Sequence, residues 1–488
     1  MILTLIAIPI LMALLNLGRW NLGLRRIILT IGALLMLALS AALAVRVDHQ
    51  GAVTAMNGSL RVDALSAILL LTVNGAAAAA FPYSGGYLEE LSVRQAIAPR
   101  EIRRFSILLP LFALMTTLVP LLNNLGLVWG AMEAATLAAV FLVAFYRTEE
   151  ALEAAWKFLI ITSIGSLIGL VGTLVFFSAA ATIAGPETYA GWTALLSLAP
   201  RLSPGAITFG FTLVAIGYGT KAGVTPMHTW MPDAYSRAPS PVCALLSGSE
   251  LSCAMYIIFR YVPIAERCVG HVFLFHLLGG IGLATLLVAA LFVVAQREYK
   301  RLLAYSSMEH TALMLLGVAF GGPLGLFGAI WQLMTHAFIK SAMFFGAGNI
   351  LLRYGTTDME AVKGVLSRMP VTGTLWLICT AAIVGAPPFA LFGSDLSIFG
   401  SAFTHGHRVI GALTVLLLAV IYIALFYWVV RMVYGEPAPM PEDGVASRDA
   451  GVWSVAPMLC LAVLALALGL VLPGGLRHLL EASASLMR

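Results

Sequence analysis

Ionisable side chains lie inside apolar stretches of this chain, where they could do proton chemistry. Lys221 follows the apolar run 207–216 and has glycines, threonines and Pro226 around it. Glycine and proline weaken helices, so we expect a break at Lys221. Glu133 lies inside another apolar segment, with the nearest charges in sequence outside it. A charge inside lipid is costly unless it is paired, so we expect Glu133 to pair with Lys221 from another helix.

Such a pair could load and release a proton. Burial favours the neutral form of a lysine, whereas a nearby carboxylate favours the charged form. If the carboxylate of Glu133 moved away, Lys221 would release its proton, and the return of the carboxylate would let Lys221 reload. The alternative is a static ion pair that only holds two helices together.

A second titratable pair comprises His336 and Lys340. They stand four residues apart in an otherwise apolar segment, so they share one face of a helix. One helical turn is a suitable step for a proton relay. Alternatively, His336 bonds a backbone carbonyl and Lys340 extends toward the membrane surface.

Asp395 follows the predicted break at Pro387-Pro388. The break frees backbone groups that need water or side chains as partners. Asp395 could therefore pass protons between water and the titratable groups inside the membrane. Alternatively, Ser394 or Asp395 caps the N-terminus of the following helix.

Four more residues are candidate relay groups. Glu309 and His310 could form an interfacial pair or an inner relay. Glu250 lies in an apolar helix, and His228 follows Pro226. For His228, structural hydrogen bonding competes with proton transfer.

The composition identifies a membrane protein. The chain has 488 residues, of which 60% are hydrophobic and 10% are charged, whereas soluble domains carry about 25% charged residues. The net charge of +5 comes from scattered residues, so we expect no nucleic-acid partner. The five cysteines lack ligand spacing, and no nucleotide-binding loop is visible, so we expect no metal, cofactor or redox site in this chain. Residues 1–17 read as a retained first helix.

We expect an all-α fold with fourteen membrane-spanning helices, each suited to a bilayer of about 30 Å. The predicted ranges are 1–17, 27–45, 62–82, 105–121, 124–146, 156–179, 206–232, 240–261, 271–296, 302–320, 323–352, 371–400, 409–433 and 453–472. We expect breaks in 206–232 and in 371–400, and an interruption of 323–352 near Thr335 to Lys340.

Basic residues and internal symmetry set the expected topology. Roughly eighteen Lys and Arg fall in loops on one side and about six on the other, which places both termini outside the cytoplasm. Two broken helices five helices apart indicate inverted five-helix repeats. We therefore divide the chain into peripheral helices 1–104, a first repeat 105–262, a second repeat 263–434, and a last helix and tail 435–488.

Several motifs resemble a known family. GTKAGVTPMHTWMPDA at 219–234, APSPVCALL at 238–246, KRLLAYSS at 300–307, THAFIKS at 335–341 and PPFALF at 387–392 resemble antiporter-like subunits of respiratory complex I. They also resemble relatives in multisubunit cation antiporters and membrane-bound hydrogenases. Within this family, segments 306–310, 348–350 and 368–373 are most similar to the F component of hydrogenase-4, from group 4 nickel–iron hydrogenase and formate hydrogenlyase complexes.

The resemblance implies a buried axis in which Glu133 pairs with Lys221, and His336, Lys340 and Asp395 follow. Relatives often carry a basic residue on the helix predicted over 240–261, where this chain has Ser247 and Ser252 in our alignment. The central link would then use water or Glu250.

The resemblance also implies a proton-translocating subunit of a redox complex in a prokaryotic inner membrane. Nickel–iron and iron–sulfur centres or a quinone would belong to partner subunits, and the ion would be the proton, with sodium as a second candidate. The alternative is a proton/sodium antiporter or an inorganic-carbon-uptake subunit that is not coupled to a hydrogenase.

Overall fold

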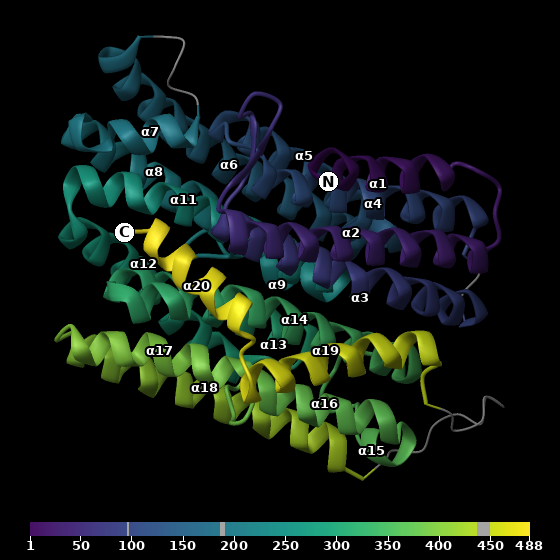
Figure 1. Ribbon diagram of the computed structural model, residues 1–488. Helices are drawn as coiled ribbons and strands as arrows, with labels where there is room; N and C mark the ends of the chain where they lie inside the picture. Colours follow the sequence, from purple (N-terminus) through teal and green to yellow (C-terminus); the bar gives the residue numbers. More distant parts are fainter. Residues whose placement is uncertain (95–96, 186–190, 437–448) are drawn as a thin grey trace.

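The computed structural model describes residues 1–94, 97–185, 191–436 and 449–488 and consists almost wholly of helices that run alongside one another (Figure 1). The first ten helices are α1 (Ile2–Leu15), α2 (Leu22–Gln50), α3 (Ala64–Arg94), α4 (Pro99–Leu121), α5 (Leu125–Val143), α6 (Glu149–Ala184), α7 (Trp192–Leu198), α8 (Pro204–Lys221), α9 (Trp230–Arg237) and α10 (Ser240–Leu245). The others are α11 (Leu251–Val269), α12 (His271–Ala295), α13 (Tyr299–Phe320), α14 (Gly322–Tyr354), α15 (Val365–Arg368), α16 (Pro370–Ile383), α17 (Ala390–Thr404), α18 (Arg408–Tyr434), α19 (Val452–Leu470) and α20 (Gly474–Leu486).

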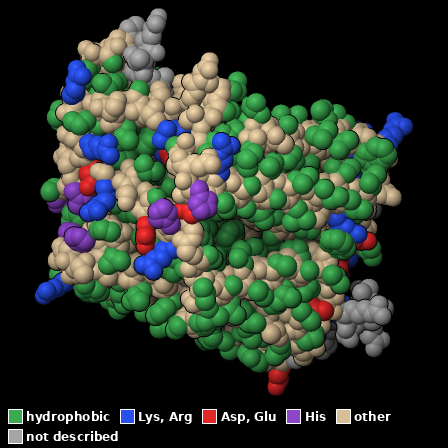
Figure 2. All heavy atoms as spheres, viewed as in Figure 1, with side chains coloured by type: hydrophobic (Ala, Val, Ile, Leu, Met, Phe, Trp, Pro, Cys, Tyr) green, Lys and Arg blue, Asp and Glu red, His purple; other side chains and the backbone are tan. Residues whose placement is uncertain are grey.

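Each of the fourteen predicted ranges contains helix. Within the described residues, ten helices are long and apolar enough to cross a membrane, and α1 and α16 are shorter apolar helices. The all-α polytopic fold is therefore confirmed, while the count of fourteen spans stays a prediction. Hydrophobic side chains cover most of the right-hand part of the face in Figure 2, as a lipid-facing surface requires.

Both predicted helix breaks are present. Helix α8 ends at Lys221 and α9 begins at Trp230, while α16 ends at Ile383 and α17 begins at Ala390. Each first half-helix is followed by a glycine in the left-handed region, Gly223 with φ 76° and Gly385 with φ 64°. Glycine adopts this conformation without a Cβ penalty, which explains why each helix stops there.

The predicted interruption near Thr335 to Lys340 is wrong. Helix α14 runs unbroken, because residues 329–345 contain neither glycine nor proline. The hydroxyls of Thr335 and Ser341 bond within the helix, donating to the carbonyls of Trp331 and Ala337 at 2.8 Å each. The polar residues of this segment therefore leave the helix intact.

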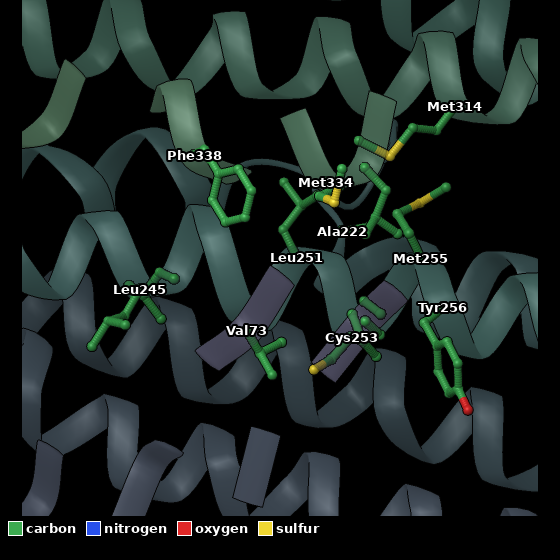
Figure 3. Packing of buried hydrophobic residues seen from close by; sticks show 14 of the residues in the cluster. Val73, Ala222, Leu245, Leu251, Cys253, Met255, Tyr256, Met314, Met334 and Phe338 are labelled. Carbon is green, nitrogen blue, oxygen red and sulfur yellow. The ribbon is translucent and has the colours of Figure 1, made fainter. Parts of the chain in front are cut away.

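One π-helical turn, residues 246–250, joins α10 to α11 inside a continuous span and ends at Glu250. Our sequence prediction did not include it. Such π turns are frequent at functional sites, because they widen the helix by one residue. Figure 3 shows Leu245 and Leu251, which flank the turn, packed among apolar side chains that include Val73 of α3 and Phe338 of α14.

Two further elements were not predicted. Strands β1 (Val53–Ala55) and β2 (Leu60–Val62) form an antiparallel hairpin between α2 and α3. Helix α20 packs on α2, α3 and α14 and crosses them obliquely in Figure 1. His478 Nδ1 of α20 lies 2.5 Å from Asp48 Oδ1 at the end of α2, which ties the last helix to the second one.

Candidate functional site

The predicted pair of Glu133 and Lys221 is present. Lys221 is the last residue of α8 and is fully buried, and its Nζ lies 3.2 Å from Glu133 Oε2 on α5. The hydroxyl of Ser163 on α6 donates to Glu133 Oε1 at 2.6 Å. The α8 break thus places a cation next to a carboxylate that a second helix holds in position.

Lys221 also reaches a second carboxylate through a hydroxyl. Its Nζ donates to Thr136 Oγ1 at 2.5 Å, and Thr136 Oγ1 donates to Glu250 Oε1 at 3.0 Å. Glu250 ends the π turn and is 1% exposed. Lys221, Glu133, Thr136 and Glu250 therefore form one polar group, which we call the first cluster.

Lys340 anchors a second cluster between α13 and α14. Its Nζ donates to Ser306 Oγ at 3.0 Å and to the carbonyl of Leu303 at 3.3 Å, and Ser306 Oγ donates to Glu309 Oε2 at 3.4 Å. Lys340, Ser306 and Glu309 are all buried. Because Lys340 bonds inside the bundle, the alternative in which it extends to the membrane surface is wrong.

Two histidines belong to the second cluster. His310 Nδ1 lies 2.9 Å from Gln332 Nε2, and His310 Nε2 lies 3.9 Å from Glu309 Oε1. The ring of His336 lies 5.0 Å from that of His310, and both of its nitrogens are buried without a hydrogen-bond partner among the described residues. Among the described residues, the alternative in which His336 bonds a backbone carbonyl is not found, and Glu309 and His310 are buried rather than interfacial.

Asp395 lies at the far end of the second cluster. Tyr422 OH donates to Asp395 Oδ2 at 3.3 Å, and the neighbouring Ser394 donates to Gln332 Oε1. Asp395 Oδ1 is buried and has no partner within the part of the chain that the structure describes. The N-cap alternative is wrong, because α17 begins at Ala390 and has no side-chain cap.

His228 stands apart from both clusters. It lies between α8 and α9, is 8% exposed, and places Nδ1 3.5 Å from Thr225 Oγ1. This contact favours the structural alternative for His228.

Several polar partners were missed in the sequence. Thr136 is three residues after Glu133, Ser306 is three before Glu309, and Gln332 is four before His336, so helical spacing could have identified each of them. Tyr422 gave no such signal, because its partner Asp395 is on a different helix.

The fold and these clusters define a polytopic helical membrane protein that keeps a row of ionisable groups inside its bundle. The family model described as "NADH:quinone oxidoreductase/Mrp antiporter, TM" matches residues 123–422, which is more than half of the chain. The chain therefore belongs to this family, as its motifs predicted.

Two relatives illustrate the breadth of the family. The hydrogenase-4 component F homolog of Methylacidiphilum infernorum is 34% identical over 77% of this chain and 79% of that protein. NADH-quinone oxidoreductase subunit N of Desulforudis audaxviator is 28% identical over 78% of this chain and 74% of that protein.

A solved structure extends the likeness to the whole fold. A chain of respiratory complex I from Thermus thermophilus aligns with a TM-score of 0.81 at 24% identity, covering 100% of both chains. At this identity the similarity concerns the fold alone, and it includes the helices outside the matched family region.

Proposed function

We propose that this chain is the proton-translocating membrane subunit of a redox complex of the hydrogenase, formate hydrogenlyase or complex I type. The observation that carries the proposal is Lys221, a fully buried cation at the end of a half-helix and in contact with the carboxylate of Glu133. Buried ionisable groups on broken helices mark ion pathways in membrane proteins. The names of the two relatives described above fit this role.

The second cluster supplies the remaining groups that would carry the proton. A proton released from the Lys221 side would reach Lys340 and be handed through Glu309, His310 and His336 toward Asp395. Each of these groups is buried, so water outside the bundle does not compete for the proton. Asp395 keeps an unpartnered carboxylate oxygen among the described residues, and that oxygen is a proton acceptor ready for use.

The free energy that drives proton translocation would come from redox reactions in partner subunits. Nickel–iron and iron–sulfur centres or a quinone would belong to those subunits, and electron transfer there would change the distance between Glu133 and Lys221. The complex would lie in a prokaryotic inner membrane with both termini of this chain outside the cytoplasm, as the distribution of basic residues supports.

The test is proton translocation in inverted membrane vesicles from cells that carry Lys221→Ala in the intact complex. H2, formate and NADH are each supplied as reductant, and acidification is followed with a pH-sensitive dye beside the redox rate. We expect proton translocation to be lost while the complex still assembles. Lys363→Ala, which removes a lysine outside both clusters, is the matched control. Wild-type proton translocation in the Lys221 variant would refute the proposal.

A cation antiporter is the second candidate, because the family description includes Mrp antiporters. In that case, adding Na⁺ to energised vesicles would dissipate the pH gradient without any redox partner. Purification from native membranes separates the two candidates: a co-purifying hydrogenase or quinone-reducing arm supports the redox complex. An inorganic-carbon-uptake subunit would co-purify with neither.

A further inference from the structure

The span Ser240–Val269 contacts α5 of the first cluster and α14 of the second. On this span the resemblance leads us to expect a basic residue, and the chain has Ser247 and Ser252 instead. Ser252 Oγ donates to the carbonyl of Gly248 in its own helix at 2.7 Å and takes no part in either cluster. We propose that Glu250, reached from Lys221 through the hydroxyl of Thr136, carries the proton across this position. This inference rests on the proposed function and assigns its central step.

Hydrogen bonds connect Lys221 to Glu250 when the Thr136 hydroxyl points at Glu250 Oε1 rather than at the carbonyl of Met132, its other acceptor at 3.1 Å. Lys221 Nζ donates to Thr136 Oγ1, and Thr136 Oγ1 donates to Glu250 Oε1, at 2.5 Å and 3.0 Å. A hydroxyl donates and accepts at once, so Thr136 can take the lysine proton as it gives its own to the carboxylate. Lys221 becomes neutral, Glu250 becomes a neutral carboxylic acid, and Thr136 is unchanged.

The charge balance of the first cluster favours the uptake of one proton from outside it, whereas the transfer from Lys221 to Glu250 leaves the net charge unchanged. One lysine and two carboxylates carry a net charge of −1 when all three are ionised. An isolated charge in a buried site is costly, and one additional proton makes the cluster neutral. Glu250 is the carboxylate suited to hold that proton, because it is 1% exposed, whereas the side chain of Glu133 is 20% exposed. Each carboxylate has one oxygen without a hydrogen-bond partner among the described residues, but that of Glu133 lies 3.2 Å from Lys221 Nζ.

The π turn that carries Glu250 lies between helices of the two clusters. The turn contacts α5, which carries Thr136, and also α3 and α14. Ser247, three residues before Glu250 in the same turn, places its Oγ 3.0 Å from Ser307 Oγ on α13. Ser307 adjoins Ser306, whose hydroxyl accepts from Lys340 at 3.0 Å.

Two gaps remain: one between Glu250 and the Ser247–Ser307 hydroxyl pair, and one between Ser307, whose hydroxyl donates to the carbonyl of Leu303, and Ser306. A rotation of the Glu250 carboxyl or one water molecule would close the first, and a second water molecule would close the other. Lys340 on the far side would then receive the proton through Ser306. The route replaces the absent basic residue by one carboxylic acid and a set of hydroxyls.

The experiment compares variants that differ by one hydroxyl or one charge. Thr136→Val removes the hydroxyl and keeps the shape, whereas Thr136→Ser keeps the hydroxyl. We expect Thr136→Val and Glu250→Gln to lower the proton translocation rate of the intact complex by about a hundredfold, the size of a lost proton-transfer group. Thr136→Ser should retain most of the rate, and Ser252→Ala is the control within the same helix.

A spectroscopic readout separates a relay from a structural role. Infrared difference spectra of the complex during turnover should show a carboxylic acid C=O band that is absent in Glu250→Gln. A wild-type translocation rate in both Thr136→Val and Glu250→Gln, or an unchanged infrared band in Glu250→Gln, would overturn the inference. If Lys221→Ala still abolishes translocation in that case, the proposed function stands without this step. If the Lys221→Ala variant also translocates protons, both the proposed function and the inference about Glu250 fail.

Discussion

Asp233 and Asp395 occupy the same position relative to the two helix breaks. Each lies seven residues after a proline of its break, since 233 − 226 and 395 − 388 both equal 7. The left-handed glycines Gly223 and Gly385 precede those prolines by three residues each. The two breaks therefore share one local design, which supports the predicted repeats.

Aligning the two breaks on their glycines and prolines changes which residues of the two predicted repeats correspond. Lys221, five residues before its proline, corresponds to Ile383, so Asp395 is the counterpart of Asp233 and not of Lys221. Asp233 accepts from Arg301 at 2.7 Å and from Lys157 at 3.0 Å, whereas Asp395 accepts from Tyr422. The same position relative to the break thus holds an ion-paired carboxylate, Asp233, in the first half and a carboxylate that accepts from a hydroxyl, Asp395, in the second half.

The two aspartates should respond differently to neutralisation. Asp233→Asn removes two partly exposed ion pairs, each worth about 0.2–1 kcal/mol, so we expect a slightly lower melting temperature. Asp395→Asn removes a buried charge without breaking an ion pair, so we expect unchanged stability but loss of proton translocation. Thermal unfolding and vesicle acidification measure the two effects. The reverse pattern would contradict the assignment of Asp395 to the relay.

A buried ion pair outside the clusters should be purely structural. Arg260 on α11 donates to both carboxylate oxygens of Asp63 at 2.7 Å and 2.6 Å, and both residues are buried. Breaking one side of a buried pair costs about 3–5 kcal/mol when the other charge is left unpaired. In this site Arg61 Nε, 3.6 Å from Asp63 Oδ2, stays as a weaker partner, so we expect the lower end of that range. We expect Arg260→Met to lower the melting temperature strongly.

The double variant Arg260→Met with Asp63→Asn is the control for that pair. It should recover part of the stability, because no unpaired charge remains. Equal destabilisation in the single and double variants would show that the charge pairing does not govern the cost.

Close packing of α6 on α8 should fix the position of Lys221. A Cβ added at Gly217, one turn before Lys221, would clash with the backbone of Gly169 on α6. We expect Gly217→Ala to force the helices apart, at a cost of about 1–3 kcal/mol, and to reduce proton translocation. Gly130→Ala on α5, where an added Cβ meets open space, is the control and should be neutral or slightly stabilising. A wild-type rate in Gly217→Ala would mean that the position of Lys221 does not depend on this contact.

Gln332 connects α14 to both of its neighbours in the second cluster. Its Nε2 donates to His310 Nδ1 on α13, and its Oε1 accepts from Ser394 on α17. We expect Gln332→Leu, which keeps the volume, to slow proton translocation while Glu133 and Lys221 stay paired. Gln332→Glu keeps an acceptor and should retain more of the rate. Equal rates in wild type and Gln332→Leu would exclude Gln332 from the route.

The main elements of the site could be predicted because lipid makes isolated charges costly. Glu133 and Lys221 each needed a partner, and each was the most suitable partner for the other. The two helix breaks could be predicted from glycine and proline, because the backbone preferences of these residues do not depend on tertiary contacts. The roles of the predicted site residues remain predictions, since geometry brings the groups together without showing a proton move.

Other features depend on contacts that a single sequence does not reveal. The polar segment near Thr335 suggested an interruption, but the hydroxyl bonds to its own helix. The π turn that ends at Glu250 contains Gly248, but its sequence does not distinguish it from an α-helical turn. Helical spacing places Thr136 beside Glu133, but its contacts with Lys221 and Glu250 become visible only when α5, α8 and the π turn 246–250 are placed together.

The partial exposure of Glu133 has a practical consequence for handling this protein. Its side chain is 20% exposed, and on the same helix Leu127, Leu137 and Phe141 are among the exposed apolar residues. The apolar surface of the isolated chain therefore includes one partly exposed carboxylate, that of Glu133, which lipid tails cannot solvate. Detergent or a neighbouring subunit will set the local polarity there. Measurements on the separated chain should accordingly be compared across detergents, nanodiscs and the intact assembly before they are attributed to the protein itself.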